Sequence, residues 1–152
     1  MRQKRVDGFI IAAAYDDDKN VLELVKSGVP VVLLEGDIDC DAQYVDRVLS
    51  NNFKGGYIAT KHLTDLGHRD IACLLGPSRM KVNLEREQGY FKAMKEAGIG
   101  IKDEFVAYGE IKIEFGFEKA IEMFSYAPKP SAFFVANDLR LQQRTPHRFK
   151  AI

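Results

Sequence analysis

An arginine near the start of an amphipathic segment is the first residue of this sequence with an obvious capacity to bind a ligand. In LEREQGYFKAM (84–94), Arg86 lies about one turn after Asn83, where the pattern places the start of a helix. A cation in the first turn of a helix is unfavourable by roughly 0.3–1 kcal/mol at an exposed site. Two kinds of group would compensate its charge: the neighbouring Glu85 and Glu87, or a hydroxyl or carboxylate of a bound ligand.

A second polar pair directly follows an apolar segment. Asn137 and Asp138 come after AFFVA (132–136) and offer an amide, which donates and accepts hydrogen bonds, beside a carboxylate acceptor. This chemistry suits small molecules that are rich in hydroxyl or amide groups. The same two residues would equally suit a plain Asx turn, so the residues alone leave both interpretations open.

Motifs of the common catalytic and cofactor sites do not occur in the sequence. There is no GxGxxG, GxxxxGK[ST], GxSxG or HExxH, and GPSRMKVNLER (76–86) lacks the glycines and lysine of a phosphate loop. Cys40 and Cys73 stand alone, which argues against a disulfide framework and a zinc site. We interpret His62 and His68 as structural and expect neither enzymatic activity nor a cofactor.

Charge and hydropathy limit the partners of the chain. Its 22 basic and 22 acidic side chains cancel, so the chain as a whole has no electrostatic attraction for nucleic acid or an anionic membrane. No apolar run approaches the roughly 20 residues of a membrane span, and the N-terminal residues do not resemble a signal peptide. These features favour a cytoplasmic protein. The segment 139–152 carries basic but no acidic residues, and we expect it to be an atypical, disordered tail.

The elements that would position these residues follow an α/β pattern, because short apolar runs alternate with amphipathic segments. Most runs are continuously apolar, as in parallel strands covered on both faces. Strands are expected at Gly8–Ala12, Val31–Leu34, Tyr44–Leu49, Ile71–Leu75, Phe105–Tyr108 and Ala132–Ala136. Helices are expected at Asp18–Ser27, Gly55–Leu66, Leu84–Ala97 and Phe115–Ser125.

Helix ends and buried faces also have sequence signals. Gly28, Gly67 and Gly98 fall just past three of the expected helices, where a left-handed cap needs a residue without Cβ. Two apolar stripes at helical spacing are predicted to be buried. The first comprises Ile58, Ala59, His62, Leu63 and Leu66, and the second Phe117, Ala120, Ile121 and Phe124.

In an open parallel α/β sheet, ligands bind outside the carboxyl ends of the strands. The residues at these exits here are polar, aromatic or flexible. They include Tyr15 after the first strand, Glu35 after the second, and Asn137 after the sixth. The segment with Arg86 follows the fourth strand, so Arg86 would face the same crevice as Asn137.

Several segments carry a resemblance to a known family. They are RVDGFII, GVPVVLLEGD, NNFKGGYIATKHLTDLGHRDIACLLGP, REQGYFKAMKEAGI and PSAFFVAND. In order and spacing these resemble the effector-binding core of bacterial LacI/GalR-type transcriptional regulators, over roughly Val6 to Asp138. The resemblance implies a periplasmic-binding-protein-like fold of type I, in which two Rossmann-like lobes clamp a sugar or similar metabolite. Closure would then alter a homodimer and the grip of a separate helix-turn-helix on operator DNA.

The resemblance also implies roles for individual residues. Arg86 matches the ligand-binding arginine of the family, with Glu85 and Glu87 tempering its charge when the cleft is empty. Asn137 and Asp138 match the ND signature of the family. The remaining effector contacts would be Met80 and Val82 in a variable loop, Ile111 where some members stack an aromatic ring, and Tyr15 and Glu35 on the other lobe.

Parts of the family pattern are missing from this sequence. Residues 1–66 are expected to form a partial N-terminal lobe and residues 67–138 a partial C-terminal lobe, without the helix-turn-helix and the opening elements of the family. Operator binding would require that absent domain. A first lobe without its opening strand would have an unpaired edge, so we expect self-association.

The function expected from the sequence is therefore that of an incomplete effector-binding domain of a LacI/GalR-type regulator. The alternative is a periplasmic sugar-binding protein of a transporter, which would require a secretory signal upstream. A Rossmann-like or flavodoxin-like enzyme is a third possibility and would require a cofactor loop after one of the strands.

Overall fold

The computed structural model describes residues 6–12, 18–35, 38, 45–110 and 112–137. Its chain divides into two compact units. Unit 1 comprises residues 1–51 and 79–82, and unit 2 comprises residues 52–78 and 83–152. The sequence analysis placed the boundary after residue 66, so the helix at 52–65 falls in the other unit from the one expected.

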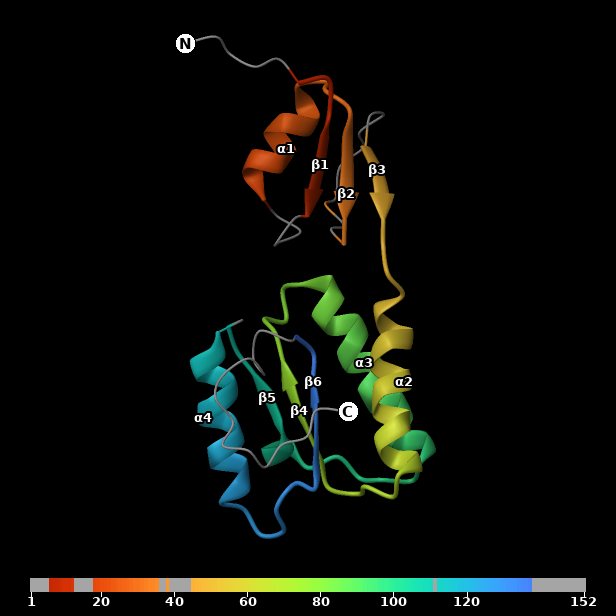
Figure 1. Ribbon diagram of the computed structural model, residues 1–152, viewed down its shortest axis with the longest axis vertical. Coiled ribbons are helices and arrows are strands. Elements are labelled where there is room, and N and C mark those ends of the chain that lie inside the picture. Colours follow the sequence, from red (N-terminus) through yellow and green to blue (C-terminus); the bar gives the residue numbers. More distant parts are fainter. Residues whose placement is uncertain (1–5, 13–17, 36–37, 39–44, 111, 138–152) are drawn as a thin grey trace. The chain divides into compact units, whose positions relative to one another are not determined.

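In unit 1, the described residues up to 51 form a parallel three-stranded sheet and one helix (Figure 1). The Asp18 carboxylate caps the helix by accepting hydrogen bonds from the amides of Asn20 and Val21. A small core lies between helix and sheet, with Val21, Val25, Val31, Leu33 and Ile38 buried. The elements are β1 (Phe9–Ala12), α1 (Lys19–Lys26), β2 (Val31–Leu34) and β3 (Val45–Val48), with strand order β1-β2-β3.

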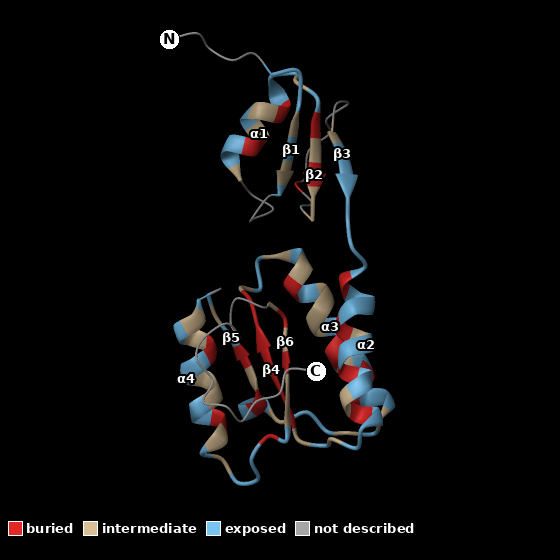
Figure 2. Cartoon of the chain, in the orientation of Figure 1, coloured by how far each residue is buried: buried red, intermediate tan, exposed pale blue. Residues whose placement is uncertain are grey.

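Unit 2 contains a second parallel sheet with helices on both faces (Figure 1). Its strands are in the order β5-β4-β6, and β4 at the centre is buried along its whole length (Figure 2). Helices α2 and α3 cover one face and α4 covers the other. The elements are α2 (Asn52–Asp65), β4 (Ile71–Leu75), α3 (Lys81–Glu96), a 3-10 turn (Asp103–Phe105), β5 (Val106–Tyr108), α4 (Ile113–Phe124) and β6 (Ala132–Val135).

The parallel α/β prediction is confirmed, and the expected ranges of β2 and β4 match the structure to the residue. Coverage of strands on both faces holds for β4. In the described part of unit 1, by contrast, burial alternates along β1 and β2, because α1 packs on one face of that sheet. None of the described helices is long and apolar enough to cross a bilayer.

The three predicted glycine caps are confirmed. Gly28, Gly67 and Gly98 have φ of 78°, 90° and 66°, in the left-handed region that side chains with a Cβ avoid. After α2, the Gly67 amide donates to Thr64 and the His68 amide donates to Leu63. These two bonds satisfy carbonyl groups of the last turn of the helix, so the chain leaves α2 in a fixed direction toward β4.

The apolar stripe predicted on α2 is largely wrong. Ile58 and Leu66 are 53% and 55% exposed, Ala59 and His62 are exposed as well, and Leu63 is half-buried. The buried face of α2 instead carries Asn52, Gly56, Thr60 and Thr64. This face is small and polar because α2 lies directly against the backbone of α3, where large side chains would not fit.

The stripe predicted on α4 is also only partly buried. Phe117 and Ile121 are 52% and 55% exposed, whereas Ala120 and Phe124 are half-buried. The helix turns Gly116 and Met123 toward the sheet instead. Met123 fills the space over Ala72 and Leu74 of β4 in the second core of unit 2.

Candidate functional site

Three strand ends of unit 2 lie side by side. Leu75 of β4 pairs with Tyr108 of β5, and Leu74 pairs with Val135 of β6. Tyr108, Leu75 and Ala136 therefore form one row across the sheet. Because the strands are parallel, the segments after them leave from the same edge, which is where ligands bind in open α/β sheets.

Arg86 lies in the second turn of α3 rather than the first. The helix begins at Lys81, before the expected start near Asn83. The unfavourable effect of a helix N-terminus on a cation falls off within the first turn. The positive charge of Arg86 therefore needs less compensation by a nearby group than the sequence suggested.

The guanidinium of Arg86 is held by two oxygen atoms of unit 2. Its Nε donates to Oδ1 of Asn52 at 2.9 Å, and its Nη1 donates to the carbonyl oxygen of Ala136 at 2.5 Å. These bonds join α3 to the start of α2 and to the end of β6. Within the described residues Arg86 forms no ion pair with Glu85 or Glu87, so neither carboxylate compensates its charge through a direct contact.

Two glycines bring Arg86 and Asn52 together. A Cβ at Gly56 would lie 2.1 Å from the carbonyl oxygen of Arg86, and one at Gly89 would lie 2.2 Å from that of Phe53. Both distances are far shorter than van der Waals contact, so only glycine permits this approach of α2 to α3. Asn52 lies one turn before Gly56 and is 5% exposed, which directs its amide toward the guanidinium.

The loop after β4 is fixed by Asn83. The buried Asn83 side chain donates from Nδ2 to the carbonyl oxygen of Pro77 at 3.1 Å. Gly76 leaves room for it, since a Cβ there would lie 2.0 Å from that nitrogen. Met80 and Val82, predicted to contact the effector, are half-buried, and both group with unit 1.

Asn137 directly follows the residue that accepts from Arg86. It is half-buried and has an interaction partner of its own within the chain. The structure thus brings Arg86 to the same strand end as Asn137, as the sequence analysis expected of these two residues. Their contact with an effector remains a prediction.

At the end of β5, Tyr108 contacts the carboxylate of Glu87 from α3, a contact that the sequence analysis did not predict. The Tyr108 hydroxyl donates to Oε1 of Glu87, the residue next to Arg86 in α3. Burial, and then this hydrogen bond, raises the pKa of Tyr108 above its ordinary value. The signal available in the sequence was that Tyr108 is the last residue of an expected strand; in the sheet it lies opposite Leu75, the last residue of β4.

The remaining predicted site residues are in unit 1 or outside the described residues. Glu35 has a φ of 59°, and its Oε1 accepts from the amide of Ser50 at 2.9 Å and from the Ser50 hydroxyl. This contact joins the end of β2 to the segment after β3. Tyr15, Ile111 and Asp138, together with the tail at 139–152, lie outside the described residues.

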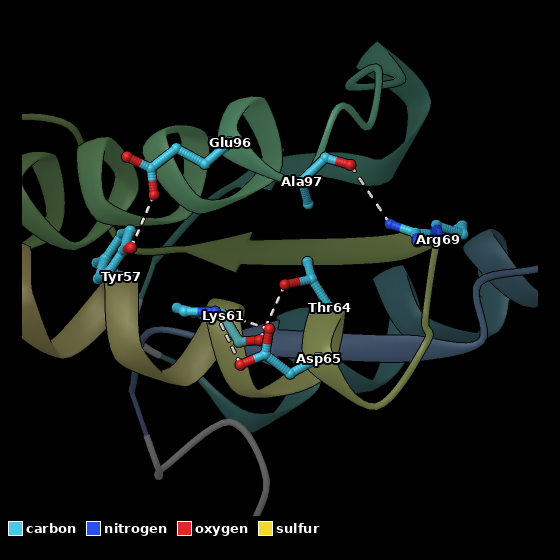
Figure 3. A network of polar contacts seen from close by, with 7 residues as sticks. All are labelled: Tyr57, Lys61, Thr64, Asp65, Arg69, Glu96 and Ala97. Atoms are coloured by element: carbon cyan, nitrogen blue, oxygen red, sulfur yellow. Dashed lines mark hydrogen bonds and ion pairs between the residues drawn. The ribbon is translucent and has the colours of Figure 1, made fainter.

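Two hollows occur at the opposite end of unit 2. One of about 170 Å³ is lined by Lys61, Thr64, Asp65, Ala93, Glu96 and Ala97, and another of about 480 Å³ runs along Arg69, Asp70 and 97–102. Figure 3 shows that the polar groups around the first hollow are paired with one another. Tyr57 donates to Glu96 at 2.7 Å, and Lys61 forms an ion pair with Asp65 at 2.7 Å. These contacts are exposed and suit a solvated surface.

The described residues offer no cluster for a metal ion. No group of three or more potential metal ligands occurs among them. Burial raises the pKa of the Cys73 thiol well above its ordinary value, and Cys73 packs as an apolar group in the core of unit 2. His68 contacts Ser131 at 3.0 Å, in keeping with the structural role expected of it.

Comparison with known proteins identifies relatives of the chain. Residues 1–140 match the family of periplasmic binding proteins and the sugar-binding domain of the LacI family. The HTH-type transcriptional repressor PurR of Photobacterium profundum is 36% identical over 141 residues, and PurR of Proteus mirabilis is 33% identical over 141 residues. In both cases the match covers 91% of this chain and 41% of the relative.

Solved structures agree with these sequence matches. A LacI-family regulatory protein from Chloroflexus aggregans has a TM-score of 0.76 at 29% identity, covering 90% of this chain and 48% of that one. The complex of the transcriptional regulator CelR with cellobiose has a TM-score of 0.76 at 34% identity, covering 89% and 41%. The chain thus spans less than half the length of these relatives. It belongs to the family of periplasmic binding proteins and LacI-type sugar-binding domains.

Proposed function

We propose that this chain is the effector-binding core of a bacterial LacI/GalR-type transcriptional regulator and that it binds a small sugar-like metabolite between two lobes. The observation that carries the proposal is the position of Arg86. Its guanidinium lies at the carboxyl edge of a parallel sheet, at the same strand end as Asn137. The complex of the relative CelR with cellobiose supports a sugar as the class of ligand.

Arg86 is suited to this role because its plane is already fixed. Of the five N–H groups of a guanidinium, two donate to Asn52 and Ala136. The other three donate to none of the described residues and would be available to adjacent hydroxyls of a ligand. A donor that is held in place before binding loses little conformational entropy when the ligand arrives.

The other contacts of the proposed effector follow from the family pattern. Asp138, Met80, Val82 and Ile111 would join Arg86 and Asn137, with Tyr15 and Glu35 on the second lobe. DNA binding would reside in a separate helix-turn-helix domain, and the working protein would be a cytoplasmic homodimer without enzymatic activity. The relatives named above are transcriptional regulators, which favours this proposal over a transporter-linked periplasmic protein. A monomer in sedimentation at high concentration would contradict the dimer.

A thermal-shift screen of the full chain against monosaccharides, disaccharides including cellobiose, and purines tests the ligand. A ligand at 100 times its Kd stabilises the folded state by about 2.7 kcal/mol and raises the Tm. Arg86→Ala should remove that rise. Each variant must be compared with its own ligand-free Tm, because Arg86→Ala also loses the bonds to Asn52 and Ala136.

Arg69→Ala is the matched control for this experiment. It removes the same charge at the opposite end of the sheet, where Arg69 donates to the Ala97 carbonyl at 3.4 Å. The ligand-induced rise should survive in this variant. An unchanged rise in Arg86→Ala would show that Arg86 does not bind the ligand, and no rise with any compound in the unaltered chain would overturn the proposed function.

A further inference from the structure

Glu87 and Tyr108 make a second polar group at the edge that carries Arg86. Tyr108 ends β5 and is 49% exposed, and its hydroxyl donates to Glu87. Arg86 and Glu87 are adjacent in α3, yet their side chains reach different strands. Arg86 contacts the end of β6, whereas Glu87 contacts the end of β5.

The two groups are separated by the width of the sheet. Strand β4 lies between β5 and β6, and Tyr108, Leu75 and Ala136 occupy one row. With two interstrand spacings between them, the Cα atoms of Tyr108 and Ala136 are about 10 Å apart. That separation is comparable with the length of a disaccharide, so one ligand of sugar size can reach both groups.

The two ends of this row have opposite hydrogen-bonding character. At the β6 end, the remaining N–H groups of Arg86 are donors. At the β5 end, Glu87 uses Oε1 for Tyr108, while its Oε2 accepts from none of the described residues. A carboxylate only accepts, so a ligand must present a donor such as a hydroxyl to Glu87. Tyr108 fixes the orientation of this carboxylate.

We infer that Glu87, oriented by Tyr108, makes this edge selective for neutral polyhydroxylated ligands over sugar phosphates and sugar acids. This inference rests on the proposed function, because it names the ligand class of the same site. A neutral sugar satisfies the donors at one end and the acceptor at the other. An anionic sugar gains from Arg86 but is repelled by Glu87, and its anionic group has no hydrogen to donate to that carboxylate.

Calorimetric titration of the full chain with matched pairs of compounds tests the inference. The pairs are glucose and glucose 6-phosphate, ribose and ribose 5-phosphate, and cellobiose and cellobionate. In the unaltered chain the neutral member of a pair should bind more tightly. Glu87→Gln should raise the affinity for the anionic member roughly tenfold, as expected for removing a like charge about 10 Å away at the protein surface. The affinity for the neutral member should change less than threefold.

Glu85→Gln is the matched control, since it removes the same charge from the other neighbour of Arg86 in the same helix. Glu85 makes no hydrogen bond or ion pair to any described residue, so no contact holds its carboxylate at this edge, and the ratio of affinities should change much less than in Glu87→Gln. Glu87→Gln retains a side-chain carbonyl that accepts from Tyr108, and its unchanged melting temperature would verify the fold.

The outcomes separate this inference from the proposed function. Tighter binding of the anionic member by the unaltered chain, or an affinity ratio that Glu87→Gln leaves unchanged, would overturn the inference alone. If no compound of either charge binds the unaltered chain, the proposal of a sugar effector fails and the inference fails with it.

Discussion

The two faces of the β4–β6 sheet are covered in different ways. On one face, α2 and α3 touch through their backbones at Gly56 and Gly89, and α2 buries Asn52 and two threonines. On the other face, α4 packs through side chains, with Met123 as its deeply buried residue. The face built on glycines is the one that holds Arg86.

This difference separates positions that define geometry from positions that fill space. Backbone contact between two helices fixes their separation, because it leaves no side chain to adjust. Side-chain packing such as that of α4 tolerates changes of similar volume. The Arg86 contacts with Asn52 and Ala136 therefore depend on the first kind of packing.

The largest effect is expected for Gly56→Ala. The new Cβ would lie 2.1 Å from the Arg86 carbonyl oxygen, and both atoms are held by helix backbone. The helices would have to separate, so we expect a loss of roughly 3 kcal/mol or more in the free energy of unfolding. Urea denaturation followed by circular dichroism would measure it.

Gly55→Ala is the control, since it changes the neighbouring residue of the same helix. A Cβ at Gly55 has no heavy atom within 4 Å, so alanine should stabilise α2 by about 0.5–1 kcal/mol through its higher helix propensity. Equal effects of the two substitutions would contradict the backbone contact between α2 and α3.

The next effect concerns the other face of the sheet. Met123 is 1% exposed, and Met123→Ala should cost about 2–4 kcal/mol through lost burial and a cavity. Met123→Leu should cost less than about 1.5 kcal/mol, because its volume is similar. Ile121→Ala, at a position that is 55% exposed on the same helix, should change stability by less than about 0.5 kcal/mol. A Met123→Leu variant as unstable as Met123→Ala would mean that the packing of α4, like the contact between α2 and α3, does not tolerate a substitution of similar volume.

The same contrast explains what the sequence could and could not predict. Continuous apolar runs gave the bounds of β2 and β4, although only β4 is buried along its whole length and the buried residues of β2 alternate with half-buried ones. The buried face of α2 was predicted wrongly because its residues are small and polar. They are small because the backbone of α2 contacts α3 at Gly89. The spacing of apolar residues within α2 carries no information about a glycine in another helix.

The candidate site was predictable in its centre but not in its surroundings. Arg86 was recognised from its residue type and its place after a strand. Its partners Asn52 and Ala136 lie 34 and 50 positions away in the sequence, so the segment around Arg86 carries no sign of them. The contact of Tyr108 with Glu87 was missed for the same reason, since it depends on the order of strands in the sheet.

A smaller effect is expected for Tyr90→Phe, on the buried face of α3. The fully buried Tyr90 hydroxyl donates to the Ile71 carbonyl at 2.9 Å, and its ring stacks on Phe134. Phenylalanine keeps the ring, so the loss at pH 7 should be about 1–1.5 kcal/mol. Burial raises the pKa of Tyr90, so the protonated phenol is favoured in the folded state.

The sign of the pH dependence follows from that raised pKa. The contribution of Tyr90 to stability is complete below pH 10, the ordinary pKa of tyrosine, and is lost as the pH rises toward the folded-state value. The unaltered chain should therefore lose more stability than Tyr90→Phe between pH 9.5 and 11, measured by urea denaturation at each pH. Parallel pH curves for the two proteins would contradict this assignment.

The smallest effect is expected for Thr60→Val and has the opposite sign. Thr60 is fully buried in the face of α2 that packs inside unit 2, and its hydroxyl has no hydrogen-bond partner in the described structure. Valine has a similar shape and no polar group to leave unsatisfied, so the free energy of unfolding should rise by about 0.5–1 kcal/mol. Thr64→Val, one turn later, tests the reasoning, because the Thr64 hydroxyl donates to the Lys61 carbonyl at 2.9 Å. The free energy of unfolding of Thr64→Val should not rise. A rise in both variants would show that these threonines only fill space and that the hydrogen bond of Thr64 does not contribute to stability.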